Sequence, residues 1–192
     1  MTTLPGRPHA ALIVIDMQVG VVANAFERDR VVSKIQGLVD RARSENVAVV
    51  WVQHSDENMP IGADGWQYIA ELTRLDGESV VHKTYGDSFE DTGLGELLSE
   101  GHVGHVIITG AQTEMCIRST LHGALVRGYD TTLVADAHTT EDMRQWGFPV
   151  GPAESIVYTN MYWGWAAAPG RTAAVVSAAE VDFADRHGAE HN

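Results

Sequence analysis

The sequence has a single cysteine and few positive charges, and each scarcity argues against a class of protein. Cys116 is the only cysteine among 192 residues, so an internal disulfide cannot form, which favours a reducing compartment. Lys and Arg number 13 against 26 Asp and Glu, giving a formal net charge of -13. This charge has the wrong sign for the phosphates of nucleic acids or for an anionic membrane. We therefore expect neither as a partner.

Long apolar runs are also missing. The longest early run, residues 10–15, is stopped by Asp16 and is far too short to cross a bilayer. The first ten residues lack the apolar core of a signal peptide. We expect a cytoplasmic protein with no membrane segment. The sequence has no repeat, low-complexity linker or break in composition, so we expect a single domain over residues 1–192.

Strand-like and helix-like segments alternate along the chain. Such alternation predicts an α/β fold, a doubly wound three-layer α/β/α arrangement in which helices cover both faces of a parallel sheet of about six strands. We expect the strand order 3-2-1-4-5-6. Strands are predicted at 10–15, 47–52, 80–82, 103–109, 131–135 and 155–158, and helices at 31–42, 92–101, 116–127 and 173–183.

Three ionisable residues share one position relative to these strands. Asp16 follows the first strand, Lys83 follows the third, and Cys116 lies just past the fourth. Ligands of open α/β sheets bind beyond the carboxyl ends of the strands, where the strand order reverses. Because the first and fourth strands are neighbours there, we expect Asp16 and Cys116 to face one crevice, with Lys83 brought to it by the loop that follows.

Cys116 is predicted to lie at the start of a helix, with Thr113 as the N-cap residue. The positive end of the helix dipole favours the thiolate, which is the reactive form of cysteine. A strand, a tight turn and a nucleophile at a helix start form the geometry of the strand-to-helix hydrolases. These features indicate a nucleophilic rather than an inert cysteine.

Five segments together resemble the isochorismatase-like cysteine hydrolases, which include nicotinamidases and N-carbamoylsarcosine amidohydrolases. The resemblance extends from about residue 10 to about residue 160, in order and with the spacing of that family. It implies a catalytic triad of Asp16, Lys83 and Cys116 and no cofactor. The segments are 13–18, 82–83, 109–117, 128–130 and 135–137.

The resemblance also implies a cis peptide bond between Ala111 and Gln112. We expect this bond to aim the backbone N–H groups of Gln112 and Cys116 at one point, as an oxyanion hole. The implied reaction is hydrolysis of a C–N bond in a small amide, carbamoyl, ureido or lactam substrate through a thioester. Lactam opening would be the activity of the streptothricin hydrolases of this family.

Two alternatives remain open. The first is cleavage of a vinyl ether by a true isochorismatase, although family members of that kind lack the nucleophilic cysteine. The second is a non-catalytic protein that binds a ligand on an inherited fold. Thiol alkylation separates the cysteine hydrolase from the non-catalytic protein, because a catalytic Cys116 should react with iodoacetamide near neutral pH much faster than a free thiol does.

A metal site is not expected. Nicotinamidases hold a metal with an Asp-x-His pair after the second strand, whereas here His54 and Asp56 stand in the reverse order. The histidines form no spaced set of ligands. Whether a metal binds near His54 and Asp56 is nevertheless left open by the sequence.

The pocket is predicted with less detail. We place Gln18, Gln53 and Trp66 in its wall, because 65–67 resembles a family segment that often contributes to the active site. The aromatic segment with Trp163 and Trp165 is interpreted as a lid or a subunit interface. The resemblance favours a homo-oligomer that acts on a small molecule.

Overall fold

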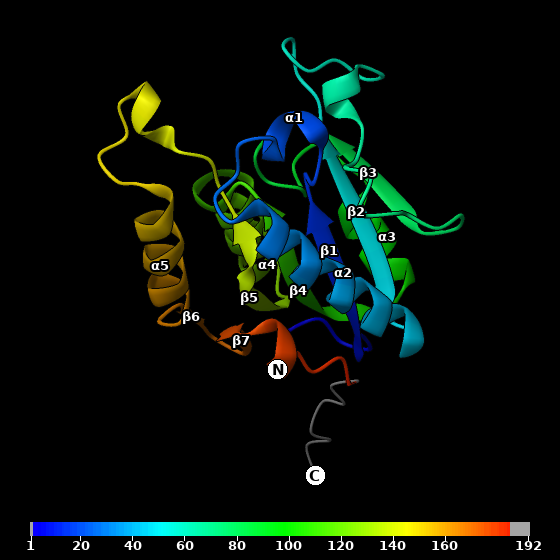
Figure 1. Ribbon diagram of the computed structural model, residues 1–192. Helices are drawn as coiled ribbons and strands as arrows, with labels where there is room; N and C mark the ends of the chain where they lie inside the picture. Colours follow the sequence, from blue (N-terminus) through cyan, green and yellow to red (C-terminus); the bar gives the residue numbers. More distant parts are fainter. Residues whose placement is uncertain (1, 185–192) are drawn as a thin grey trace.

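A seven-stranded sheet forms the centre of the computed structural model, which describes residues 2–184 (Figure 1). The strand order is β3-β2-β1-β4-β5-β7-β6, with every neighbouring pair parallel except β6 and β7. The expected doubly wound sheet of six parallel strands is therefore confirmed. The strands are β1 (His9–Ile15), β2 (Ala48–His54), β3 (Ser79–Lys83), β4 (Val103–Ala111), β5 (Asp130–Thr139), β6 (Ala167–Ala168) and β7 (Arg171–Val176).

Alternating side chains of the central strands build two separate cores. On β1, Leu12 and Val14 pack on the face that α2 covers, whereas Ile13 and Ile15 pack on the face covered by α3, α4 and α5. The continuous apolar run of β1 is explained by this burial on both faces. The helices are α1 (Val19–Val22), α2 (Arg28–Ser44), α3 (Leu94–Glu100), α4 (Arg118–Val126) and α5 (Pro152–Trp163).

Two sequence predictions near the end of the chain are wrong. Residues 155–158, predicted as the sixth strand, lie inside α5, which begins at Pro152 with its fixed φ suited to the first helical turn. Residues 173–183, predicted as a helix, contain most of β7 and a short 3-10 turn, Ala178–Glu180. Residues of β7 pair with β5 from Thr131 to Val134, and this pairing outweighs their alanine-rich composition.

The length and the polarity of the helices decide whether one of them could cross a membrane. Among the helices within residues 2–184, none combines the length and the apolar character that a membrane crossing requires. The longest, α2, has 17 residues and carries charged side chains on its outer surface.

Candidate active site

The carboxyl ends of β1 and β4 are held unusually close together, and this closeness places Asp16. Ile15 pairs with Gly110, where an added Cβ would lie 2.0 Å from the carbonyl oxygen of Ile15, so only glycine fits. Asp16 itself adopts a left-handed φ of 50°, and its N–H donates to the carbonyl of Val52. A non-glycine residue in this conformation is uncommon and is found preferentially at functional sites.

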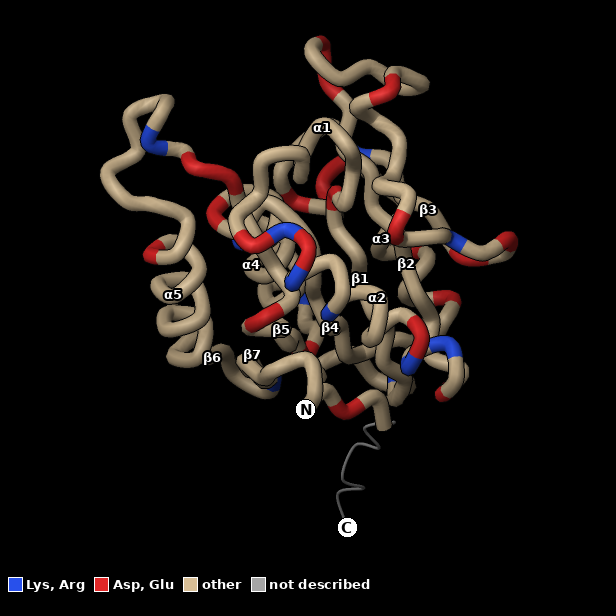
Figure 2. The backbone as a smooth tube through the Cα atoms, in the orientation of Figure 1, with Lys and Arg blue, Asp and Glu red and all other residues tan. Residues whose placement is uncertain are grey.

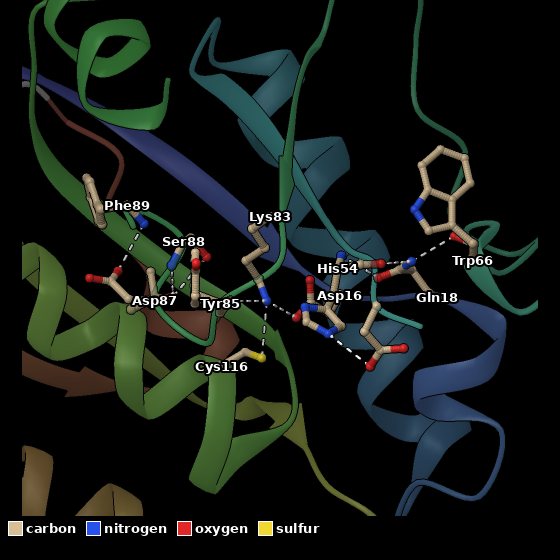
Figure 3. Close-up of polar contacts among 12 residues, drawn as sticks. Asp16, Gln18, His54, Trp66, Lys83, Tyr85, Asp87, Ser88, Phe89 and Cys116 are labelled. Carbon is tan, nitrogen blue, oxygen red and sulfur yellow. Dashed lines mark hydrogen bonds and ion pairs between the residues drawn. The ribbon is translucent and has the colours of Figure 1, made fainter. Parts of the chain in front are cut away.

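Lys83 contacts both of the other residues of the expected triad, Asp16 and Cys116 (Figure 3). Its Nζ lies 2.7 Å from Asp16 Oδ2 and 3.2 Å from Cys116 Sγ. The third donor of the ammonium group serves the carbonyl oxygen of Tyr85 at 3.2 Å. Because Lys83 ends β3 and the chain of β2 lies between β3 and β1, the lysine stem spans β2 to reach Asp16. The structure thus brings Asp16, Lys83 and Cys116 together.

The charges of this cluster are set by burial and pairing. Burial raises the pKa of Asp16 above its ordinary value, although the Lys83 charge acts against this rise. Burial alone would lower the pKa of Lys83, but the negative charge of Asp16 and the hydrogen bonds to Asp16 and Cys116 outweigh it and raise that pKa. Lys83 is therefore an ammonium ion at neutral pH, and Asp16 is the group beside it that accepts a proton most readily.

The cysteine itself differs from the sequence prediction. Cys116 lies in a π-helical turn, Thr113–Ile117, that leads into α4. Burial and the nearby charge of Asp16 raise the pKa of the thiol to about 12, although Lys83 acts in the opposite direction. The thiolate predicted from the helix start is therefore not favoured in the resting protein, because burial and the Asp16 charge outweigh the charge of Lys83. The thiol needs a base before it can attack.

Thr113 has a different role from the expected N-cap. No side-chain capping bond forms at this helix start; instead Thr113 Oγ1 lies 2.9 Å from His138 Nδ1. His138 Nε2 lies 2.9 Å from Asn160 Oδ1, and Asn160 Nδ2 donates to the carbonyl of Ala135. This last bond fixes the amide of Asn160, so His138 must donate from Nε2 and accept at Nδ1 from the Thr113 hydroxyl.

Sequence analysis missed this buried chain of hydrogen bonds. Burial lowers the pKa of His138 to about 4, so the ring is neutral and keeps one donor and one acceptor nitrogen. The chain ties the turn that carries Cys116 to β5 and α5. Its only sequence signal is a histidine three residues after the predicted strand 131–135, and the partner Asn160 lies just beyond the segment 155–158 that was predicted as a strand.

A cavity of about 410 Å3 opens beside the cluster. It is reached from the loops at the carboxyl ends of the strands, and Asp16 and Cys116 form part of its wall. The lining residues are Asp16, Gly20, Val21, His54, Asp56, Asn58, Met59, Gly65, Gln112, Met115, Cys116 and Glu141.

Gln18, Gln53 and Trp66 are not among these lining residues. Gln18 Nε2 donates to the carbonyls of His54 and Trp66, and Gln18 Oε1 accepts from the His54 N–H. Gln53 Nε2 donates to the same carbonyl of Trp66 at 3.1 Å. The side-chain amides of Gln18 and Gln53 therefore hold the segment after β2 in place behind the residues that line the cavity. The alternation of side chains along a strand does not predict this supporting position.

The turn before Cys116 matches the expected geometry in one respect. The peptide bond between Ala111 and Gln112 is cis. The carbonyl of Gln112 accepts from the N–H groups of Met115 and Ile117, which closes the π-helical turn. The side chain of Gln112 points to Glu141, to which its Nε2 donates at 3.0 Å. Glu141, like His138, is a residue at the site that sequence analysis did not identify.

The sequence left open whether His54 and Asp56 bind a metal ion. His54 Nε2 lies 3.4 Å from Asp56 Oδ2, a pair rather than a ligand set. Within residues 2–184, no group of three or more His, Cys, Asp or Glu side chains is arranged to hold a metal ion.

Trp163 is completely buried in the core beneath α4, whereas Trp165 is 77% exposed. Trp163 is thus a core residue rather than part of a lid.

A family model and several known proteins are similar to this chain in sequence. A family model described as the isochorismatase domain matches residues 10–148. A streptothricin hydrolase from Streptomyces noursei is 36% identical over 143 residues, which cover 71% of this chain and 57% of that protein. A second streptothricin hydrolase from the same organism is covered over 50% of its length, so the chain spans about half the length of these relatives.

Two further matches extend over most of both chains. The ureidoacrylate amidohydrolase RutB of Enterobacter sp. (strain 638) is 25% identical, with 86% of this chain and 91% of that protein covered. The crystal structure of an isochorismatase from Pseudomonas putida KT2440 is 28% identical and superposes with a TM-score of 0.77, covering 91% of each chain.

Proposed function

This chain belongs to the isochorismatase family, and we propose that it is a cysteine-dependent hydrolase that cleaves a C–N bond. The substrate class is a small amide, carbamoyl, ureido or lactam compound, and the intermediate is a thioester on Cys116. The observation that carries the proposal is the ammonium group of Lys83, which lies within 3.2 Å of both Asp16 and Cys116 beside a cavity. The names of two relatives, streptothricin hydrolase and ureidoacrylate amidohydrolase, support the same bond type.

The first step transfers a proton and forms a C–S bond. The sulfur of Cys116 attacks the substrate carbonyl carbon, and the thiol proton passes to Asp16, whose raised pKa makes it a competent acceptor. The carbonyl oxygen becomes an oxyanion, for which the backbone N–H groups of Gln112 and Cys116 are the proposed donors. Lys83 holds Asp16 and Cys116 close to each other through its ammonium group. Its positive charge offsets the negative charge that the pair carries.

The remaining steps return the protein to its starting state. Asp16 gives the proton to the substrate nitrogen, the C–N bond breaks, and the amine or ammonia leaves. Water then attacks the thioester while Asp16 takes one of its protons, and that proton returns to the departing sulfur of Cys116. One water is consumed for each C–N bond, and the products are a carboxylic or carbamic acid and an amine or ammonia; from a lactam, both groups remain on one molecule.

The test measures amine release and looks for the thioester. Ammonia and amine release from a panel of primary amides, ureido compounds and lactams identifies a working substrate. With that substrate, Cys116→Ala and Cys116→Ser should each lose turnover by about 1000-fold or more. Intact-mass analysis after rapid acid quenching should show the acyl group on the wild-type chain and not on Cys116→Ala.

The outcomes separate the alternatives. If Cys116→Ala keeps full turnover while Asp16→Asn loses it, the thioester is excluded and the chemistry is thiol-independent acid–base catalysis, as in vinyl ether cleavage. If the panel and a vinyl ether both yield no product with correctly folded protein, the proposed hydrolase activity fails. Far-UV circular dichroism and the midpoint of thermal unfolding verify that each variant is folded.

A further inference from the structure

The outer side of α5 is apolar where a surface helix is normally polar. Val157, Tyr158 and Met161 are 66%, 62% and 47% exposed, and Trp165, just after the helix, is 77% exposed. The surface formed by these four residues is called the α5 face below. We propose that the α5 face is the interface through which two copies of this chain form a symmetric dimer. This inference goes beyond the proposed function and does not depend on it.

The residue pattern of α5 explains why this surface is unusual. Thr159 and Trp163, four residues apart, form its buried stripe. Val157, Tyr158 and Met161 recur at helical spacing on the other side of the helix, which faces solvent. A helix that is apolar around most of its circumference is normally covered on both sides. The sheet covers only one side of α5.

The helix α2 provides a comparison within the same molecule. Its buried residues are apolar, whereas its exposed residues, such as Asp29, Gln36 and Asp40, are charged, polar or glycine. This is the pattern of a helix with one side in the core and the other in water. The outer side of α5 instead carries the residue types that α2 places in its core.

The distribution of charge favours a second copy as the occupant. Residues 155–179 contain no Asp or Glu, although the chain has 26 of them and a formal net charge of -13. Figure 2 accordingly shows α5 with charge colouring only near its start. Two such acidic copies repel each other unless they meet through an uncharged surface. A basic partner, which the net charge would otherwise attract, finds no carboxylate on the α5 face.

The area of this surface is close to what a dimer needs. The exposed fractions of the α5 face correspond to roughly 500 Å2, since large side chains have about 150–250 Å2 each. Trp146 and Phe148, which are 59% and 39% exposed in the segment before α5, bring the total to roughly 750 Å2. A stable interface covers about 800 Å2 on each partner, whereas monomers rarely expose apolar patches beyond a few hundred Å2.

A two-fold axis near the middle of α5 uses all of this surface. The segment with Trp146 and Phe148 leads into one end of α5, and Trp165 lies just beyond the other end (Figure 1). When two copies of α5 pack antiparallel, Trp165 of each copy lies beside the segment before α5 of the other. Tyr158 is near the midpoint of α5, so it faces the same residue of the second copy. Such a contact closes at two copies.

The central tyrosine is held in place by its neighbours. The ring of Tyr158 stacks on Tyr162 with 6.0 Å between centroids, and Tyr162 stacks on His122 of α4 at 5.6 Å. The guanidinium group of Arg118 lies 5.9 Å from the centre of the Tyr162 ring. An aromatic side chain that is ordered beforehand loses little entropy on association. We therefore expect Tyr158 to contribute most to the interface.

The test measures mass in solution by sedimentation velocity and light scattering over a wide range of chain concentrations. The wild type should have twice the mass of the chain. Tyr158→Lys and Tyr158→Glu each place two like charges opposite each other at the axis, so the dimer Kd should rise by about 100-fold or more. An equal mixture of the two variants should restore a dimer, because Lys then faces Glu.

Ile61→Glu is the matched control. Ile61 is as exposed as Val157, at 66%, but lies in the loop between β2 and β3. This variant adds the same charge as Tyr158→Glu to another apolar surface position, so its dimer Kd should stay within about threefold of the wild type. Far-UV circular dichroism and the midpoint of thermal unfolding verify that every variant is folded.

Each outcome decides the inference. A wild-type chain that stays monomeric at all concentrations overturns it, as does a dimer that both Tyr158 variants leave intact. An equal rise of Kd in Ile61→Glu also overturns it, since dissociation would then follow from added net charge. If the single variants dissociate and their mixture stays monomeric, the α5 face does not contact its own copy, and the symmetric dimer is excluded.

Discussion

Asp16, which lines the cavity, and its partner Lys83 are almost completely buried, whereas Asp56 and Met115, which also line the cavity, are exposed. The charges of Asp16 and Lys83 are held at 2.7 Å by a fixed geometry, and each is compensated by the other. The carboxylates of Asp56 and Glu141 lie nearer to solvent, and no Lys or Arg is among the residues that line the cavity. Desolvated, paired charges serve proton transfer, whereas charges near solvent act through the potential that they create in the cavity. The buried pair and the solvent-facing carboxylates should therefore respond differently to mutation, pH and salt.

The largest expected effect is on stability, from breaking the buried pair. Lys83→Met removes the ammonium and leaves Asp16 as an uncompensated buried carboxylate, which should cost about 3–5 kcal/mol of unfolding free energy. Asp16→Asn in the Lys83→Met background should restore much of that loss, since no buried charge then remains. Chemical denaturation of the two single variants and the double variant measures the coupling. Additive losses would contradict the description of Asp16 and Lys83 as one paired unit.

Asp16→Asn should separate reactivity from catalysis. The negative charge of Asp16 is one cause of the raised thiol pKa, so its removal lets Lys83 lower that pKa. We expect faster labelling of Cys116 by iodoacetamide together with a loss of turnover of about 1000-fold or more, because the proton acceptor is gone. Rates of labelling and of product release are measured on the same preparation. Slower labelling in Asp16→Asn would contradict the assigned electrostatics.

Alkaline pH should weaken the folded protein through Cys116. The folded thiol has a pKa of about 12 and the ordinary value is 9.0, so above pH 9 the unfolded chain loses a proton that the folded chain keeps. Stability should then fall by up to about 1.4 kcal/mol per pH unit between pH 9 and 12. Cys116→Ala lacks this contribution, whereas Lys83 titrates in both chains.

The difference between wild type and Cys116→Ala, followed by denaturant unfolding from pH 7.5 to 10.5, therefore isolates the thiol. Thiolate absorbance at 240 nm gives a direct measure, with the same variant as the blank. A titration step of the folded thiol below pH 8 would contradict the raised pKa and would revive the thiolate expected from the helix start.

The chain from Thr113 through His138 to Asn160 should affect rate more than binding. Thr113→Val and His138→Asn each release the turn that carries Cys116, and we expect kcat to fall about tenfold with little change in KM. The double variant should lose no more kcat than either single variant, because each of the three variants breaks the same chain of hydrogen bonds. His105→Asn is a matched control, since His105 pairs with Thr132 at 2.8 Å at the opposite end of the sheet. An equal loss of kcat in that control would indicate a general effect on the fold.

The sequence predicts the buried cluster around Lys83 far better than the solvent-facing carboxylates. Asp16, Lys83 and Cys116 each follow a strand, and the order of parallel strands determines which strand ends meet. Even so, the sequence does not reveal the degree of burial, so the thiol pKa was assigned the wrong direction. Glu141 could not be identified, because it lies in a loop after β5 whose path depends on tertiary contacts.

The mistaken elements have a related physical cause. The stretch 155–158 is apolar but short, and such a run fits either a strand or a helix until its flanks are known. In 173–183, alanine favours a helix locally, yet pairing with β5 from Thr131 onward selects a strand. Both errors lie at the sheet edge near α5, where local preference and long-range pairing disagree.

The smallest expected effect is the response to salt, and it distinguishes the buried pair from the solvent-facing carboxylates without any mutation. At 0.5 M salt the screening length falls to about 4 Å, so the attraction of Asp56 and Glu141 for a cation weakens. When Cys116 is labelled with a cationic and an anionic methanethiosulfonate reagent of similar size, the cation-to-anion ratio of the labelling rates should fall by about two- to threefold between 20 mM and 0.5 M NaCl. The absorbance titration of the thiol should shift much less, because Asp16 and Lys83 are shielded from the salt by protein. If the labelling ratio and the thiol pKa shifted together, both would report a single solvated field, and the distinction between the buried pair and the solvent-facing carboxylates would have no physical basis.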